Sequence, residues 1–109
     1  MFKFMLMFTQ PPDVSTFENS YQDLLALIER MPHIQRRQVV HITGSPAGAA
    51  RLYRVLEVYF ADETQMRAAL LSAAGQEAGG EIQRFPVGTF ELVFAEVYEE
   101  AGGNTHASA

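Results

Sequence analysis

Two hydrophobic periodicities alternate along this chain, and the order in which they appear leaves few folds open. The residues from Phe2 to Thr9 are almost all apolar, which is typical of a strand whose two faces are both covered. A stretch with apolar residues at helical spacing follows, and then come two runs rich in β-branched and aromatic residues. A second helical stretch and a last alternating run complete the pattern. The sequence therefore predicts the order strand, helix, strand, strand, helix, strand.

The bounds of the first helix can be predicted from its flanking residues. Ser15 with Glu18 three residues later has the pattern of a capping box, so the helix should begin near Thr16. Pro32 should close it, because proline disfavours helical backbone in the residue before it. The apolar residues between these points form one stripe: Phe17, Tyr21, Leu24, Leu25, Ile28 and Met31.

The second helical stretch carries a similar start signal but a weaker body. Asp62 with Gln65 again has the pattern of a capping box. The apolar face that follows consists of Met66, Ala69, Leu70 and Ala73. Three glycines at positions 75, 79 and 80 each lower helix stability by about 1 kcal/mol relative to alanine. We therefore expect a break there and a short extra helical turn.

Three further strands are predicted from β-branched, aromatic and alternating residues. Residues 35–43 and the run Leu52–Phe60 flank turn residues at 44–48, so they should form a hairpin. The last strand should span residues 89–98, after the turn residues Pro86 and Gly88. This is the split βαβ order of ferredoxin-like domains, an α+β fold with a four-stranded antiparallel sheet. The domain should occupy residues 1–100, with a disordered tail over residues 101–109.

Length, charge and cysteine content exclude several classes of protein. At 109 residues the chain has room for one domain. Its longest apolar run is far shorter than the roughly 20 residues of a membrane span. A net charge of −5 argues against nucleic-acid binding, which depends on clustered cations. The sequence has no cysteine, which excludes disulfides and thiolate chemistry and agrees with a reducing compartment. We expect a cytoplasmic protein with no nucleic-acid or membrane partner.

The predicted sheet has more apolar surface than two helices can cover. Two helices cover one face of a four-stranded sheet, yet the first, third and fourth strands carry apolar residues on both faces. A second face left in water would expose a larger apolar patch than soluble monomers usually tolerate. A second copy of the chain is the simplest cover. We therefore expect a homodimer that pairs through the sheet face to form an α+β barrel.

Several short motifs occur in a recognisable order between residues 2 and 98. They are Pro11-Pro12-Asp13 after the opening strand, Phe17 and Tyr21 in the first helix, the turn at 44–48, the run Leu52–Phe60, residues 72–76 and the closing run 92–97. In this order they resemble the EthD family, named for ethyl tert-butyl ether degradation, within the wider group of dimeric α+β barrels. The resemblance implies a ferredoxin-like fold, a homodimer, and an association with oxidative degradation or polyketide modification. The chain departs from many relatives in lacking a histidine shortly after Tyr21.

Alternation along the strands predicts which side chains share a face of the sheet. One set should face the helices: Val40, Ile42, Leu56, Val58 and Phe60. The other set should face the interior of the expected barrel: Lys3, Arg37, Val39, His41, Tyr53, Val55, Glu57 and Tyr59. Glu57 is the unusual member of this second set, because burying a carboxylate is costly unless it is hydrogen-bonded or paired.

Two interpretations of Glu57 are open. In the first, Glu57 lines a pocket with His41 or Tyr53, and these residues are catalytic, with Glu57 as an acid or base whose pKa is raised by desolvation. In the second, Glu57 only fixes the register of the strands by pairing with a basic residue, Lys3, Arg37 or Arg54. Convergence of Glu57, His41 and a tyrosine would favour an enzyme, whereas an interior of salt bridges would favour an accessory role.

We expect the chain to hold a small apolar or aromatic ligand between the sheet and the helices, without a metal or cofactor. Methionine adapts its shape easily, so the opening strand suits such a pocket, and the expected ligand contacts are Phe4, Met5, Tyr21 and Tyr59. His41 alone is too little for a metal site and weak support for haem. The chain is either a cofactor-free oxidoreductase or cyclase of an oxidative degradation or polyketide-type pathway, or a non-catalytic binding or accessory protein.

Overall fold

The order of elements in the structure, a computed structural model that describes residues 1–101, follows the predicted order closely. The elements are β1 (Phe2–Thr9), α1 (Val14–Ile28), β2 (Arg36–His41), β3 (Leu52–Phe60), α2 (Glu63–Leu71), α3 (Ala73–Ile82) and β4 (Phe90–Glu96). The predicted disorder of residues 102–109 falls outside the described residues.

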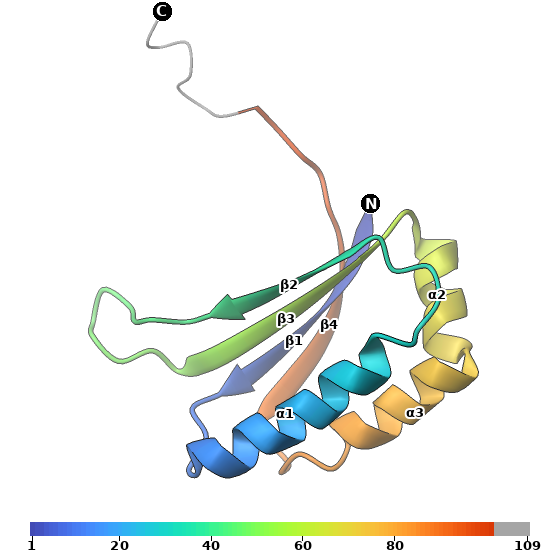
Figure 1. Ribbon diagram of the computed structural model, residues 1–109. Helices are drawn as coiled ribbons and strands as arrows, with labels where there is room; N and C mark the ends of the chain where they lie inside the picture. The colour runs from blue at the N-terminus through green and yellow to red at the C-terminus, as the bar shows by residue number, and fades with distance from the viewer. Residues whose placement is uncertain (102–109) are drawn as a thin grey trace, which may run out of the picture.

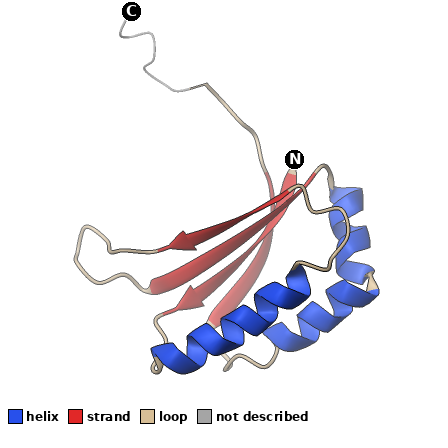
Figure 2. Cartoon of the chain, viewed as in Figure 1, coloured by secondary structure: helices blue, strands red, loops and turns tan. Residues whose placement is uncertain are grey.

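The strands form one antiparallel sheet in the order β2-β3-β1-β4. The helices of the described chain all lie on one side of this sheet, which leaves the other side without a helical layer (Figure 1). Figure 2 shows the same two layers, strands in one and helices in the other. The chain therefore has the predicted ferredoxin-like α+β fold. We call the face of the sheet that carries no helix the open face.

The core lies between the sheet and the helices. Alternate residues of the two central strands point into it: Phe4, Leu6 and Phe8 of β1, and Leu56, Val58 and Phe60 of β3. They meet buried residues on one side of each helix, including Tyr21, Leu24, Ile28, Met66, Ala69 and Ile82. Burying a side chain of this size stabilises the fold by roughly 1.5–3 kcal/mol. This layer therefore fixes the helices against the strands.

Helix α1 begins slightly earlier than predicted, and its cap is a different residue. The Asp13 carboxylate accepts a hydrogen bond from the Thr16 backbone N–H at 3.2 Å, so Asp13 and not Ser15 is the N-cap. The predicted capping box is wrong because Glu18 instead reaches across to β3. For α2 the predicted start is confirmed, since Asp62 is the N-cap and accepts from the Gln65 N–H at 2.9 Å.

The expected break is present, but it falls at Ser72, before the three glycines, and these lie inside a helix that is longer than the expected short turn. Ser72 ends α2 and caps α3, a full ten-residue helix, by accepting from the Gly75 N–H at 3.1 Å. A Cβ on Gly75 would lie 2.2 Å from the Ala69 carbonyl oxygen, so the two helices meet at this angle only with glycine there. Ala78 and Ile82 are buried where α3 packs against α1. This packing outweighs the weak helix propensity of the glycines.

The prediction of which side chains face the helices is right for most of β3 and wrong for β2. Residues directly opposite each other on paired strands share a face. Arg37 pairs with Val58 and Val39 with Leu56, so Arg37, Val39 and His41 lie on the helix side. Arg36, Gln38 and Val40 therefore lie on the open face. Since β2 is an edge strand with two adjacent valines and polar residues on both sides of them, alternation could not decide its orientation, and pairing with β3 sets it instead.

A bulge in β3 reverses the predicted position of Tyr53. Phe8 pairs with Arg54 but the next residue, Thr9, pairs with Leu52, so β3 has one extra residue opposite β1. As a result Tyr53 packs on the helix side, where its ring centre lies 5.3 Å from that of Phe17. The expected place of Tyr53 on the barrel interior is therefore wrong, because the strict period of two is interrupted at this point.

Candidate functional site

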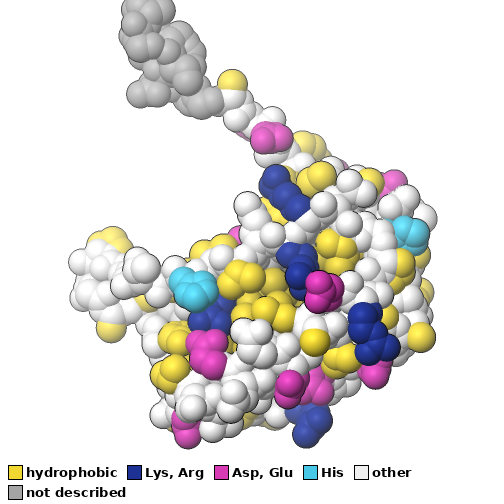
Figure 3. Space-filling model, viewed as in Figure 1, with side chains coloured by type: hydrophobic (Ala, Val, Ile, Leu, Met, Phe, Trp, Pro, Cys, Tyr) yellow, Lys and Arg dark blue, Asp and Glu magenta, His cyan; other side chains and the backbone are white. Residues whose placement is uncertain are grey.

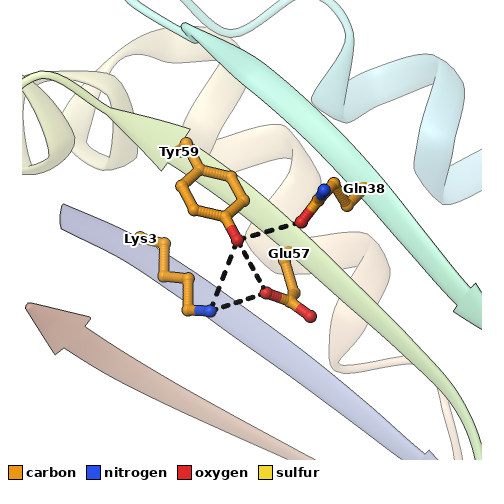
Figure 4. Close-up of polar contacts among 4 residues, drawn as sticks. All are labelled: Lys3, Gln38, Glu57 and Tyr59. Carbon is orange, nitrogen blue, oxygen red and sulfur yellow. Dashed lines mark hydrogen bonds and ion pairs between the residues drawn. The ribbon is translucent and has the colours of Figure 1, made fainter. Parts of the chain in front are cut away.

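A cluster of polar side chains occupies the open face where β1, β2 and β3 meet. It consists of Lys3, Gln38, Glu57 and Tyr59, which we call the open-face cluster (Figure 4). The Lys3 ammonium donates to Oε1 of Glu57 at 2.6 Å. The Tyr59 hydroxyl lies 3.0 Å from the same Glu57 oxygen and 2.9 Å from Oε1 of Gln38, so its single proton is donated to one of the two. The four side chains form one continuous network.

Charge and partial burial set the protonation of this cluster. The side chains of Lys3 and Glu57 are only 16% and 15% exposed. The hydrogen bond from Lys3 lowers the pKa of Glu57 below its ordinary value, and this effect outweighs the opposite effect of burial. Burial would lower the pKa of Lys3, but its hydrogen bonds to Glu57 and Tyr59 together raise it. Glu57 is therefore ionised at neutral pH, and the expectation of a raised pKa is wrong.

The alternative interpretation of Glu57, a pair with a basic residue, is confirmed for Lys3. Lys3 lies on β1 and Glu57 on β3, so the ion pair bridges the two central strands. The Arg36 guanidinium adds a second positive charge, 4.3 Å from the centre of the Tyr59 ring. The sequence did not single out Gln38 because its orientation depends on the register of an edge strand.

A second polar cluster lies on the helix side of the sheet, around Arg54. Arg54 is only 4% exposed. Its guanidinium makes two hydrogen bonds to the Glu18 carboxylate, at 3.1 and 2.8 Å, and the Tyr53 hydroxyl donates to the same carboxylate at 2.9 Å. The hydrogen bonds from the guanidinium have the largest effect, and together with the bond from Tyr53 they hold the pKa of Glu18 below its usual range. The possible pairing of Arg54 with Glu57 is therefore wrong, and the position of Arg54 on the core-facing side of an apolar strand could have indicated this cluster instead.

The structure separates the residues that the sequence placed in one catalytic group. Glu57 lies in the open-face cluster, whereas Tyr53 and His41 lie on the helix side, and His41 pairs opposite Arg54. The expected convergence of the three is therefore wrong. A catalytic role for this group stays a hypothesis, and within the open-face cluster it depends on Glu57 without His41 and Tyr53.

The four expected ligand contacts are divided in the same way. Phe4 and Tyr21 belong to the core on the helix side, 2% and 1% exposed. Met5 and Tyr59 lie on the open face, because they pair opposite Glu57 and Lys3. One small ligand cannot contact all four within one chain, since the sheet lies between the two pairs.

A groove opens between α2 and the strands β1 and β4. Its volume is about 370 Å³, and six apolar residues line it: Phe2, Met66, Leu70, Leu71, Phe94 and Ala95. Charged residues at its edge include Glu63 and Arg67, which pair at 3.1 Å. We call this site the α2–β4 groove. It exists because the helices stop short of edge strand β4, and the helix-side residue Phe94 is therefore 59% exposed.

A smaller hollow lies at the other end of β1, and we call it the aromatic pocket. Its volume is about 240 Å³, and it is lined by Phe8, Phe17 and Phe85 together with Pro11, Pro12 and Pro86. Polar residues, among them Asp13, Thr16 and Ser20, complete its wall. No sequence pattern indicated this pocket, since its lining comes from two distant segments of the chain, residues 8–20 and 84–89.

A membrane span and a metal site each place definite requirements on residues 1–101. No helix within residues 1–101 is long and apolar enough to cross a membrane. In the same part of the chain, no three His, Cys, Asp or Glu residues lie close enough together to hold a metal ion. In the view of Figure 3, acidic and basic side chains are interspersed, with hydrophobic atoms between them.

No protein-family model and no curated protein matches the sequence. The fold matches a member of the ethyl tert-butyl ether d (EthD) family from Bacillus halodurans C-125 with a TM-score of 0.85 and 25% identity, over 90% of this chain and 99% of that one. It also matches SnoaB, a cofactor-independent oxygenase from Streptomyces nogalater, at a TM-score of 0.65 and 16% identity, over 91% and 94%. A dimeric ferredoxin-like protein of unknown function from Jannaschia sp. CCS1 matches with a TM-score of 0.62 and 16% identity. This match covers 89% of this chain and 100% of that one. The chain therefore resembles the EthD family in structure as well as in its sequence motifs.

Proposed function

We propose that this chain works as a homodimer that binds a small apolar or aromatic molecule in the α2–β4 groove. The observation that carries the proposal is the groove itself, with six apolar side chains around about 370 Å³. Small-molecule sites are usually clefts of roughly 300–1,000 Å³ with mainly apolar walls and few polar groups. The cytoplasmic location stays a prediction.

The exposure of the groove's walls supports an apolar occupant. Leu71 is 73% exposed and Phe94 is 59% exposed, although both are large apolar side chains. A bound apolar molecule would remove this surface from water, which is favourable by roughly 25 cal/mol per Å². The Glu63–Arg67 pair at the edge neutralises its own charges, and Glu96 adds one carboxylate to the lining, so the site disfavours an anionic ligand.

The open face supports the homodimer. Its apolar members are Met5, Met7, Val40, Val55, Val93 and Ala95, spread over all four strands. A second copy would cover them, as the dimeric state of several structural neighbours suggests. The Lys3–Glu57 pair would lie within such an interface with its charges already matched.

Titration with N-phenyl-1-naphthylamine, a neutral dye that fluoresces in apolar sites, tests the groove. We expect saturable binding to the wild-type protein, and Phe94→Ala should weaken it by about tenfold, because a large part of one wall is removed. Leu92→Ala is the matched control, since Leu92 is an exposed apolar residue of the same strand that does not line the groove. Equal binding by the two variants would contradict the proposal.

A cofactor-free enzyme is the second candidate, and the open-face cluster favours it. A carboxylate, an ammonium and a phenol lie within 3.5 Å of one another, and one neighbour with this fold is a cofactor-independent oxygenase. Because the pKa of Glu57 is lowered, the carboxylate is ionised and suited to accept a proton, although its pairing with Lys3 makes it a weak base.

Oxygen uptake with a panel of polyphenolic compounds tests this second candidate. An enzyme should consume oxygen with at least one compound, and Glu57→Gln should abolish the uptake while the dimer and dye binding persist. If Glu57→Gln leaves uptake, binding and dimer mass unchanged, Glu57 has no catalytic role and serves only to connect the strands.

A further inference from the structure

We infer that the aromatic pocket is a second binding site, for a small planar aromatic molecule that carries a hydroxyl or amino group and no negative charge. Within residues 1–101 it shares no lining residue with the α2–β4 groove. The two sites also lie at opposite ends of β1, since one contains Phe2 and the other Phe8. The inference therefore goes beyond the proposed function and can fail independently of it.

Three phenylalanine rings form the floor of the pocket. The ring centre of Phe8 lies 4.9 Å from that of Phe85 and 5.1 Å from that of Phe17, and the last two are 5.9 Å apart. Aromatic rings attract one another at centre distances of about 4.5–7 Å in tilted and edge-on arrangements. The existing rings already adopt such arrangements, so a ligand ring that contacts the exposed edges of Phe17 and Phe85 would extend this cluster.

The floor and the rim are held in place by the protein itself. Phe8, Phe17 and Phe85 are 1%, 8% and 6% exposed, so their rings are fixed by core packing. At the rim the Thr89 backbone N–H and hydroxyl both donate to the Pro86 carbonyl oxygen, and the Thr9 N–H donates to the Thr89 carbonyl at 3.0 Å. A preformed site loses little conformational entropy when it binds, which favours a small ligand.

The polar part of the wall selects the functional group of the ligand. Thr16 and Ser20 place two hydroxyls one helical turn apart on α1, and Asp13 places a carboxylate beside them. The carboxylate accepts one bond from the Thr16 N–H, and an ionised carboxylate has about four acceptor positions. It therefore favours a ligand with an O–H or N–H donor and repels an anionic one. Arg84, the cation in the wall, is 78% exposed and pairs with Glu81, so it offsets this repulsion little.

The volume limits the size of the ligand. An apolar cavity of about 150 Å³ suffices for benzene, and this pocket has about 240 Å³. One ring or two fused rings therefore fit, whereas a larger polycyclic molecule does not. A phenol, a naphthol, an indole or an aromatic amine meets the requirements of size, flatness and hydrogen bonding together.

Titration calorimetry with 2-naphthol, compared with 2-naphthoate, tests the inference. The wild-type protein should bind 2-naphthol with a one-to-one stoichiometry per chain and about tenfold more tightly than 2-naphthoate. Thr16→Phe should fill the pocket and abolish this binding. Ser15→Phe is the matched control, because Ser15 is the exposed neighbour on α1 that does not line the pocket. Thermal melting of both variants checks that each is folded.

Two further variants make the result specific. Asp13→Asn keeps an N-cap side chain and should reduce the preference for 2-naphthol over 2-naphthoate about tenfold or remove it. Phe94→Ala, which changes only the α2–β4 groove, should leave 2-naphthol binding unchanged, so loss of binding there would move the ligand to the other site. Absence of saturable binding by the wild-type protein, or equal binding by Thr16→Phe and Ser15→Phe, would overturn the inference.

Discussion

Glu18 and Glu57 keep their charges for similar reasons on opposite faces of the sheet. Each carboxylate accepts hydrogen bonds from a cation that is largely buried, Arg54 in one case and Lys3 in the other. In both pairs the cation lowers the pKa of the carboxyl group, and this effect outweighs the rise in pKa that burial causes. The two ion pairs connect β3 to α1 and to β1. They therefore add stability that depends on protonation.

Acid should remove this stability. An unfolded glutamate has a pKa of about 4.3, and the folded values lie lower. At pH values between the folded and the unfolded pKa, the unfolded chain binds more protons than the folded one, so the free energy of unfolding falls as the pH decreases. Above about pH 5 both states are ionised and the full stability is present. Glu18→Gln should be less stable than wild type at neutral pH and should lose less on acidification, as measured by urea denaturation from about pH 7 to about pH 3.

Glu77→Gln is the control for this prediction. Glu77 pairs with Arg30 at 3.6 Å, but both side chains are more than half exposed, at 55% and 63%. Exposed pairs contribute roughly 0–1 kcal/mol, so this variant should follow the wild-type curve. Parallel curves for wild type and Glu18→Gln would contradict the assignment of the acid sensitivity to the buried pair.

Helix α3 illustrates how one element depends on a single contact. Gly75 is buried where α3 turns away from α2, and its α-carbon faces the carbonyl groups of Ala69 and Leu70. Further along the same helix, Gly79 has open space around the position that a Cβ would occupy. The two glycines therefore have opposite roles, one required by packing and the other only weakening the helix.

Alanine substitutions at these two positions should shift stability in opposite directions. Gly75→Ala should destabilise the protein by about 1–3 kcal/mol or more, because the added methyl group cannot avoid two backbone carbonyls. Gly79→Ala should stabilise it by about 0.5–1 kcal/mol through helix propensity. Thermal or urea unfolding measures both, and a loss of stability in both variants would show that the contact at Gly75 is not the cause.

Sequence patterns predicted the elements better than their fine geometry. The strands β1 and β3 have the predicted bounds because nearly every second residue is strongly apolar, as Leu56 and Val58 illustrate. The faces of β2 were wrong because an exposed edge strand has no apolar face to fix it. Tyr53 was misplaced by a bulge, which is set by pairing with β1 and leaves no local mark. The groove and the aromatic pocket could not be predicted, since each is assembled from segments distant in sequence.

At the scale of the whole molecule, two apolar surfaces are not covered by any other part of residues 1–101. One is the open face and the other is the α2–β4 groove beside edge strand β4. Apart from Ala95, which belongs to both, they lie on opposite sides of the sheet, so a partner on the open face leaves most of the groove accessible. Under the proposed function, substitutions should therefore change dimerisation and ligand binding separately.

Met7→Lys tests the dimer without disturbing the monomer. Met7 lies on the open face directly opposite Glu91 of β4, so the new ammonium gains a carboxylate partner in the monomer. In a dimer the same ammonium would be buried against an apolar surface, which costs several kcal/mol. Light scattering should show wild type near twice 12.1 kDa and Met7→Lys near 12.1 kDa.

Leu71→Lys provides the comparison, because Leu71 is 73% exposed at the end of α2 and away from the open face. This variant should retain the mass of the wild-type protein. A monomeric wild type, or dimers in both variants, would refute pairing through the open face.

The position of β1 also matters while the protein is being made. β1 lies between β3 and β4, and both of these strands leave the ribosome after it. The backbone bond from the Val97 N–H to the Met1 carbonyl joins residues from opposite ends of the domain at 2.7 Å. Pairings so distant in sequence form slowly. The nascent chain therefore carries a strand of phenylalanine and methionine with one unpaired edge until β4 has emerged, and we expect chaperones that bind exposed apolar segments to recognise it.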